Sequence, residues 1–358
     1  MSISGRWVAA LLAVVLTVVG ATIVVRDSDS GSAPQPAPRA TAPQPAPRVT
    51  ATSALYLSDD TLSRLDLDSG TARAIGRTPT SDIHASQSSP WVVYVVSGAG
   101  EEGGEDLLAA PVLRAINIGT GATTNIGAGF NPLWHPTDTR LAYLRPIARR
   151  QCSGERCEGL MEIVVYDPET EASTVLTEPG RFNLLAWSGE RVLAADETDL
   201  AVTLSLRSKE DVEGLNLEPS ELWDASPDGR WLVRTASDGA VLVNLDGGPE
   251  RPLPIGDGIL ADGAWSPDSK HIVAGVLNEA RTKTSALLID VPGGEVQEVT
   301  DELPGILDVT WSPDGSQFTF LTFVGRSNRT ELNLCSVVDS RCEAVGPPLQ
   351  RAILLRLE

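Results

Sequence analysis

The sequence predicts an all-β protein, a β-propeller, and a recurring phrase carries most of that prediction. The phrase is built on Trp-Ser-Pro-Asp-Gly, with short apolar or β-branched runs before and after it. Its first residue falls at successive positions 38 to 53 residues apart: Ala85, Trp134, Trp187, Ala225, Trp265 and Trp311. A repeat near 45 residues made of short strands is typical of propeller blades.

Each copy has the chemistry of a tight hairpin turn. In 311–315, proline presets φ, aspartate can accept hydrogen bonds from amides two residues on, and glycine takes the left-handed position. We therefore expect each copy to join the first two strands of a blade and to serve the fold rather than chemistry. The Trp that opens a copy is expected to pack between neighbouring blades, because its large apolar body suits a sheet interface.

The chain ends determine the number of blades. Three strand-like segments, 54–57, 62–67 and 71–75, precede the first copy. They match the second, third and fourth strands of a blade whose first strand is missing. The tail, 351–357, can supply that strand and close the ring without an exposed edge. The prediction is seven four-stranded blades closed by the C-terminal strand, with six blades as the alternative if the tail only caps an existing sheet.

The repeats resemble those of the TolB-type propeller family, whose copies centre on W-S-P-D-G after a strand. The copy at Trp311 has all five residues of that pattern and the copy at Trp265 has its first four. The copy at Ala225 has alanine in the tryptophan place, and the other three are looser. The resemblance covers residues 53–358. It implies a propeller exported from the cytoplasm that works as a protein-binding platform.

The N-terminus independently predicts export. Residues 7–25 form an apolar run of 19 residues interrupted only by Thr17, Gly20 and Thr22, with Arg6 before it and Arg26 after it. A helix of that length spans about 28 Å, close to the apolar thickness of a bilayer. We expect 1–26 to be a short tail and a single transmembrane signal-anchor, with the propeller on the extracytoplasmic side of the cell membrane. The alternative is a cleaved signal peptide and a secreted protein.

Residues 27–52 are predicted to be an extended linker. They contain a tandem nonapeptide rich in proline and alanine, 33–41 followed by 42–50. Such a segment has too few apolar groups to fold and favours polyproline II. The linker is thus expected to hold the propeller, 53–358, away from the membrane.

The charge limits the partners. The chain has 28 basic and 48 acidic residues, a formal net charge of −20. Nucleic-acid binding requires a positively charged surface, and so does peripheral binding to anionic lipid. The membrane is therefore contacted only through the N-terminal helix, and an envelope protein or a cationic ligand is the expected partner.

Four cysteines fall into two close pairs, Cys152 with Cys157 and Cys335 with Cys342. An even count, local pairing and export together predict two hairpin disulfides. Zinc is the less favoured alternative, because neither spacing is C-x-x-C and no histidine is near either pair in sequence.

The candidate functional residues lie three positions before each repeat mark. The first strands of a propeller line its central channel, so equivalent positions should form a ring. Four of these positions carry carboxylate or amide groups, at Asp82, Asn131, Asp262 and Asp308. Leu184 and Leu222 occupy the other two, and each has a polar residue directly before it, Asn183 and Glu221, which a bulge could bring into the ring. These groups either cap backbone amides or form a cation site at the channel mouth.

The sequence has no nucleophile elbow, S-x-x-K or H-E-x-x-H motif. The predicted function is therefore a non-catalytic binding scaffold in the cell envelope, with no required cofactor, although Ca²⁺ or another divalent cation is an option. The alternative is a metal-dependent propeller enzyme of the lyase or lactonase type. His84, two residues from Asp82 and on the same strand face, favours that alternative.

Overall fold

The computed structural model describes most of the chain from residue 51 onward, and all statements below concern these residues. They are 51–78, 80, 82–96, 111–149, 159–195, 201–205, 212–214, 222–236, 239–256, 258–278, 280, 282–291, 293–325 and 328–358. The expected signal-anchor and the linker up to residue 50 lie outside this set. Within the described ranges, no helix has the length and apolarity needed to cross a bilayer.

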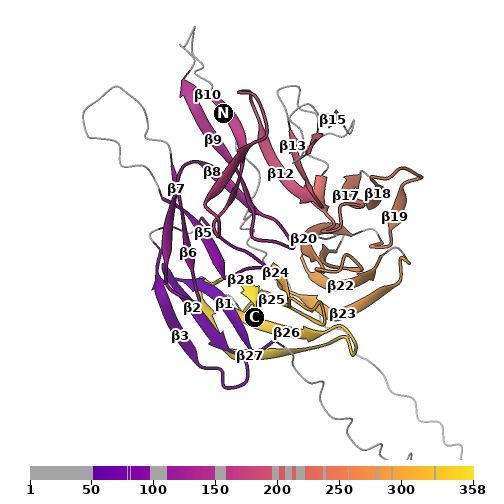
Figure 1. The fold of residues 1–358 in the computed structure, drawn as a ribbon. Helices are drawn as coiled ribbons and strands as arrows, with labels where there is room; N and C mark the ends of the chain where they lie inside the picture. Colours follow the sequence, from indigo (N-terminus) through magenta and orange to yellow (C-terminus); the bar gives the residue numbers. More distant parts are fainter. Residues whose placement is uncertain are drawn as a thin grey trace, which may run out of the picture. The chain divides into compact units, whose positions relative to one another are not determined.

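The described strands pair into seven four-stranded antiparallel sheets (Figure 1). Written from the first strand outward, three of the sheets are β4 (Ile83–Ala85), β5 (Trp91–Val96), β6 (Val112–Asn117) and β7 (Thr123–Ala128); β8 (Phe130–Trp134), β9 (Leu141–Arg149), β10 (Gly159–Asp167) and β11 (Ala172–Val175); and β12 (Asn183–Ser188), β13 (Arg191–Ala195), β14 (Ala201–Ser205) and β15 (Val212–Gly214).

Three further sheets follow in chain order, and the last sheet combines the two ends of the described chain. They are β16 (Leu222–Ala225), β17 (Trp231–Ala236), β18 (Gly239–Asn244) and β19 (Arg251–Leu253); β20 (Ile259–Trp265), β21 (His271–Leu277), β22 (Thr284–Asp290) and β23 (Val296–Leu303); β24 (Leu307–Trp311), β25 (Gln317–Phe323), β26 (Arg329–Ser336) and β27 (Arg341–Gln350); and β28 (Ile353–Leu357), β1 (Ser53–Ser58), β2 (Thr61–Asp66) and β3 (Ala72–Arg77).

The first strands form a closed ring. β4, β8, β12, β16, β20, β24 and β28 contact one another in that order, and β28 contacts β4. The composite sheet predicted from the chain ends is present, since β28 pairs antiparallel with β1 and Figure 1 shows the two strands side by side. Its pairing continues beyond the strands, where the Glu358 amide donates to the Ser53 carbonyl at 2.8 Å. The tail is thus the inner strand of its sheet, as expected.

The repeat phrase forms the turn between the first and second strands of a sheet. Ser312 Oγ donates to Asp314 Oδ1 at 2.6 Å and accepts from the Gln317 amide at 3.0 Å. Gly315 has a φ of 70°, a left-handed conformation that favours glycine. The same serine–aspartate bond recurs at Ser266, at 2.7 Å. The predicted structural role of the phrase is confirmed.

The repeat tryptophans pack between sheets, as expected. Trp187 and Trp311 are about 5% and 4% exposed. Each indole Nε1 donates to a carbonyl of the preceding sheet's first strand: Trp187 to Leu133 at 2.9 Å and Trp311 to Ala264 at 3.1 Å. Each tryptophan therefore joins two sheets by apolar packing and by one directed hydrogen bond.

The ring closure has its own side-chain contacts. Gln87 Nε2 donates to the Leu355 carbonyl on β28 at 3.0 Å, and Thr310 Oγ1 on β24 donates to Gln87 Oε1 at 3.3 Å. Arg356 donates to the Ser86 carbonyl at 2.8 Å. The tail strand is therefore tied to both neighbouring sheets.

One of the two predicted disulfides is present. Cys335 on β26 and Cys342 on β27 are directly opposite in the strand pairing and are bonded, with Cα atoms 4.1 Å apart. The other predicted pair, Cys152 and Cys157, lies outside the described residues.

Candidate functional site

All of the first strands except β4 share one irregularity at the level of the predicted ring. In each of β8, β12, β16, β20 and β24, the pairing with the second strand shifts at a bulge. β28 has the same irregularity against β1. The bulges coincide with the positions three residues before the repeat marks, and Asn131 and Asp308 there have φ of 53° and 52°. A bulge redirects its side chains, so these residues leave the regular alternation of the strand.

Side chains of the ring bond to the main chain of the next first strand. Asp262 Oδ2 accepts from the Asp308 amide at 2.6 Å. Asp308 Oδ2 in turn accepts from the Leu354 amide at 3.2 Å. The ring therefore exists here as a relay from β20 to β24 to β28, in which each carboxylate caps an amide at the equivalent position of its neighbour.

The amide members follow a related pattern. Asn131 Nδ2 donates to the Leu184 carbonyl at 3.3 Å and to Asn183 Oδ1 at 3.4 Å. Asn183 is thus brought to the ring as expected, and Leu184 takes the equivalent position in β12. Glu221, the other residue expected to reach the ring through a bulge, lies outside the described residues.

Sequence reasoning missed the seventh ring position, which is Leu354. The other ring positions were found three residues before the first residue of each repeat phrase, and the tail carries no copy of that phrase. Leu354 lies three residues before Leu357, where β28 ends, just as Asp308 lies three residues before the end of β24. That spacing from the strand end is the signal that could have found it.

The carboxyl group of Asp308 is held in an unusual electrostatic state. Burial raises its pKa from the ordinary 3.8 to about 6, the hydrogen bond from the Leu354 amide opposes the rise, and the nearby Asp262 carboxylate adds to it. The Asp308 carboxyl therefore holds less charge at mildly acidic pH than an exposed carboxyl would.

Asp82 and His84 form a separate pair at the ring. His84 Nε2 lies 2.9 Å from Asp82 Oδ1, and the two side chains are 39% and 52% exposed, respectively. The two side chains therefore point toward each other on one side of the chain. In the order of first strands, β28 lies between β24, which holds Asp308, and β4, which Asp82 directly precedes. Both side chains of the pair are accessible to solvent, as is that of Asn183.

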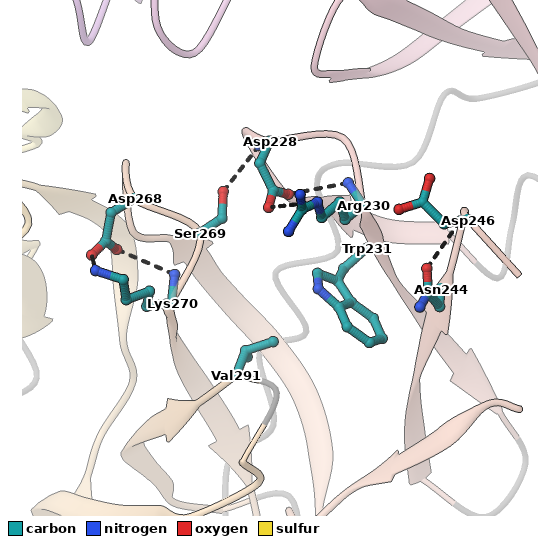
Figure 2. Close-up of a pocket in the computed structure, with 9 residues that line it drawn as sticks. All are labelled: Asp228, Arg230, Trp231, Asn244, Asp246, Asp268, Ser269, Lys270 and Val291. Atoms are coloured by element: carbon teal, nitrogen blue, oxygen red, sulfur yellow. Dashed lines mark hydrogen bonds and ion pairs between the residues drawn. The ribbon is translucent and has the colours of Figure 1, made fainter. Parts of the chain in front are cut away.

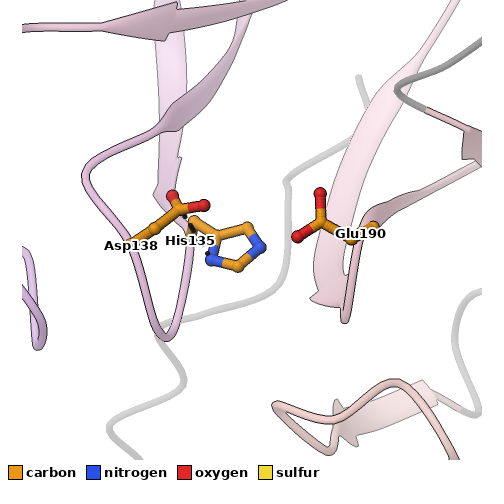
Figure 3. Close-up of side chains that lie close together, drawn as sticks. All are labelled: His135, Asp138 and Glu190. Carbon is orange, nitrogen blue, oxygen red and sulfur yellow. Dashed lines mark ion pairs between the residues drawn. The ribbon is translucent and has the colours of Figure 1, made fainter.

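A second cluster of potential metal ligands was not predicted. His135, Asp138 and Glu190 bring one ligand atom each to within 4.8 Å of one another (Figure 3). His135 and Asp138 lie in the turn after β8, and Glu190 lies in the turn after β12. The sequence gives no sign of this cluster, since Glu190 is more than 50 residues from His135 in the chain.

A guanidinium group already pairs with both carboxylates of that cluster. Arg140 donates to both carboxylate oxygens of Glu190, at 3.0 and 2.9 Å, and its Nε donates to Asp138 at 2.6 Å. His135 Nε2 lies 3.0 Å from the Gly189 carbonyl, and burial lowers the pKa of this imidazole. The cluster therefore joins two sheets through an internal cation.

Comparisons with known proteins support the propeller fold. No family model matches the chain, and no curated protein matches it. An oligogalacturonate lyase solved in complex with manganese superposes with a TM-score of 0.54 at 13% identity, over 83% of this chain and 85% of that one. A prolyl endopeptidase gives a TM-score of 0.55 at 12% identity, over 85% of this chain and 50% of its own length. TolB from Acinetobacter baumannii gives 0.47 at 16% identity, over 86% and 67%. At these identities, the lyase and the endopeptidase show that the chain is a β-propeller.

Proposed function

We propose that this chain is a non-catalytic, extracytoplasmic binding propeller, anchored in the cell membrane by its N-terminal helix. The apolar run 7–25 and the Pro-rich linker support the anchor and the spacing from the membrane. The W-S-P-D-G repeats, by their resemblance to the TolB-type family, support a role as a protein-binding platform. The partner is an envelope protein or another ligand that presents a cationic group to the channel.

The adjacent carboxyl groups of Asp262 and Asp308 carry this proposal. Burial and mutual repulsion raise the pKa of Asp308 to about 6, so at neutral pH the channel holds negative charge that a bound cation would offset. The exposed carboxylate of Asp82 extends the same polarity toward solvent. The net charge of −20 favours the approach of a positively charged partner.

Charge-removing substitutions in the channel test the proposal. We expect the double substitution Asp262→Asn with Asp308→Asn to abolish capture of partners crosslinked in intact envelopes while the melting temperature stays level or rises. Asp68→Asn is the matched control, since Asp68 is an exposed carboxylate in an outer turn, between β2 and β3. Unchanged capture by the channel variant, with reduced stability, would assign these carboxylates to folding alone.

Localisation is tested separately. In intact cells, an added protease should cleave the linker, 27–52, and release the propeller, and mass spectrometry of the purified chain should retain residues 1–26. A mature N-terminus near residue 21 would instead indicate signal-peptide cleavage and a secreted protein.

A metal-dependent propeller enzyme is the alternative, and the His84–Asp82 pair favours it. An imidazole nitrogen 2.9 Å from an exposed carboxylate is a suitable start for a divalent-metal site. The solved lyase with manganese shares the propeller fold. Metal analysis of the purified propeller separates the two functions: stoichiometric divalent metal that disappears in His84→Ala would favour the enzyme.

A further inference from the structure

A groove crosses the junction between the sheet β16–β19 and the sheet β20–β23, away from the channel ring. Its volume is about 390 Å³ (Figure 2). One wall is the turn before β21, which contains Asp268, Ser269 and Lys270. The opposite wall is formed by β17 and by the turn after β18, with Trp231 and Asp246.

The floor of the groove is apolar and aromatic. Trp231 is half-buried and Val291 is buried, and both line the groove. The Trp231 ring already has a cation over one face, since the Arg251 guanidinium carbon lies 5.5 Å from its centroid. An indole is the aromatic side chain with the strongest attraction for cations. The floor therefore suits a long side chain with an apolar stem and a positive end.

The rim carries more negative than positive charge. Lys270 pairs with Asp268 at 3.0 Å, and Arg230 lies 4.0 Å from Asp228. Asp246 adds a third, exposed carboxylate, and its own amide is held by Asn244 Oδ1 at 2.9 Å. Figure 2 shows Asp246 and Asn244 on one side of the Trp231 ring and Lys270 and Val291 on the other. The three carboxylates and two cations that line the groove therefore give a net charge of −1 at neutral pH, a count that does not include Arg251 beside Trp231.

The two walls are fixed relative to each other. The Asp228 amide donates to Ser269 Oγ at 3.0 Å, across the junction of the two sheets. Ser269 itself is only 6% exposed and has a φ of 60°. Because the walls are bonded in the free protein, binding needs little ordering of the site, which reduces the entropic cost of association.

We infer that this groove binds one cationic side chain, arginine or lysine, from a partner protein. The aliphatic stem lies against Trp231 and Val291, and the charged end lies near Asp246. The site is independent of the channel ring: loss of one leaves the other intact.

The test uses two short peptides, acetyl-Gly-Arg-Gly-amide and its neutral analogue with citrulline in place of arginine, titrated into the full chain by calorimetry at low salt. We expect the arginine peptide to bind at least tenfold more tightly than the citrulline peptide, and its affinity to fall as salt rises. Asp246→Asn should weaken binding at least threefold, and Trp231→Leu at least tenfold.

Two variants serve as controls. Asp68→Asn removes an exposed carboxylate from an outer turn of another sheet and should leave binding unchanged. In the background of the double channel substitution at Asp262 and Asp308, Asp246→Asn should weaken binding by the same factor, so failure of the channel proposal and failure of this one are distinguishable. If Trp231→Leu lowers the melting temperature, the surface substitution Asp246→Asn decides. Equal binding of the two peptides, or full affinity in Asp246→Asn, overturns the inference.

Discussion

Replacing Asp308 with asparagine removes a charge from the channel while keeping an oxygen that can accept the Leu354 amide hydrogen bond. The folded protein raises the pKa of the Asp308 carboxyl from 3.8 to about 6, chiefly through burial. The folded state therefore binds this proton more tightly than the unfolded state does. Its contribution to stability is fully present below about pH 4 and is lost as the pH rises through about 6.

The size of the effect follows from the shift in pKa. At 1.36 kcal/mol per unit, the rise corresponds to about 3 kcal/mol between the acidic and neutral limits. The amide of the Asp308→Asn variant does not titrate, so the stability of the variant relative to the wild type should increase by up to that amount from about pH 3.5 to about pH 8. For a chain of this size, the corresponding gain in relative melting temperature is roughly 6 °C.

Thermal melts of both proteins across that pH range measure the difference. The variant must be compared with the wild type because His135 also makes stability depend on pH. Burial lowers the pKa of His135, so this imidazole makes the protein less stable as the pH falls below about 6.5, which is opposite to the effect of Asp308. An Asp308→Asn variant that is less stable than the wild type by the same amount at about pH 4 and about pH 8 would refute the reasoning, since the lost interaction would then be independent of charge.

Three further predictions concern the fold. Deleting 351–358 removes β28 and exposes the edges of its neighbours, so we expect aggregation or a large loss of melting temperature; a truncated chain that melts like the full one would show that closure is dispensable. Replacing both Cys335 and Cys342 with serine should lower the free energy of unfolding in urea by about 2 kcal/mol. Non-reducing peptide maps of the wild type should contain the Cys335–Cys342 disulfide, and free thiols at these positions would contradict the prediction. Arg140→Ala should leave His135, Asp138 and Glu190 without their internal cation, so we expect a lower melting temperature that added Zn²⁺ restores in part, with no zinc response in the wild type.

The repeat phrase was a reliable guide to the sheets because its chemistry is local. Proline, aspartate and glycine act within a single turn, and a serine such as Ser312 bonds only to its own turn. The composite sheet was predictable for a related reason. The three strands at the start of the propeller lacked a first strand, and the C-terminal tail was the remaining segment that could supply it. The turns depend on residues that are neighbours in sequence, and the composite sheet depends only on counting the strands of each repeat.

The chemistry of the channel was less predictable. The positions of Asp262 and Asp308 could be counted from the repeat, but the bulge that turns them out of the strand leaves no mark in composition. Their use as acceptors for amides of the next strand depends on how closely adjacent strands approach. The groove at Trp231 and the cluster at His135 were missed because each combines residues from two sheets.

One divergence from the repeat phrase lies where one sheet is bonded to the next. In the strict copies, the second residue is a serine that closes its own turn, as Ser266 does with Asp268. In the looser copy after Trp134, that residue is His135, whose imidazole reaches the Gly189 carbonyl of the following sheet. Arg140 extends the same connection to Glu190. His135 also keeps a bond within its own turn, because its Nδ1 accepts from the Thr137 amide at 3.2 Å. The loose copy therefore retains a local turn bond and adds contacts that hold two neighbouring sheets of the ring together.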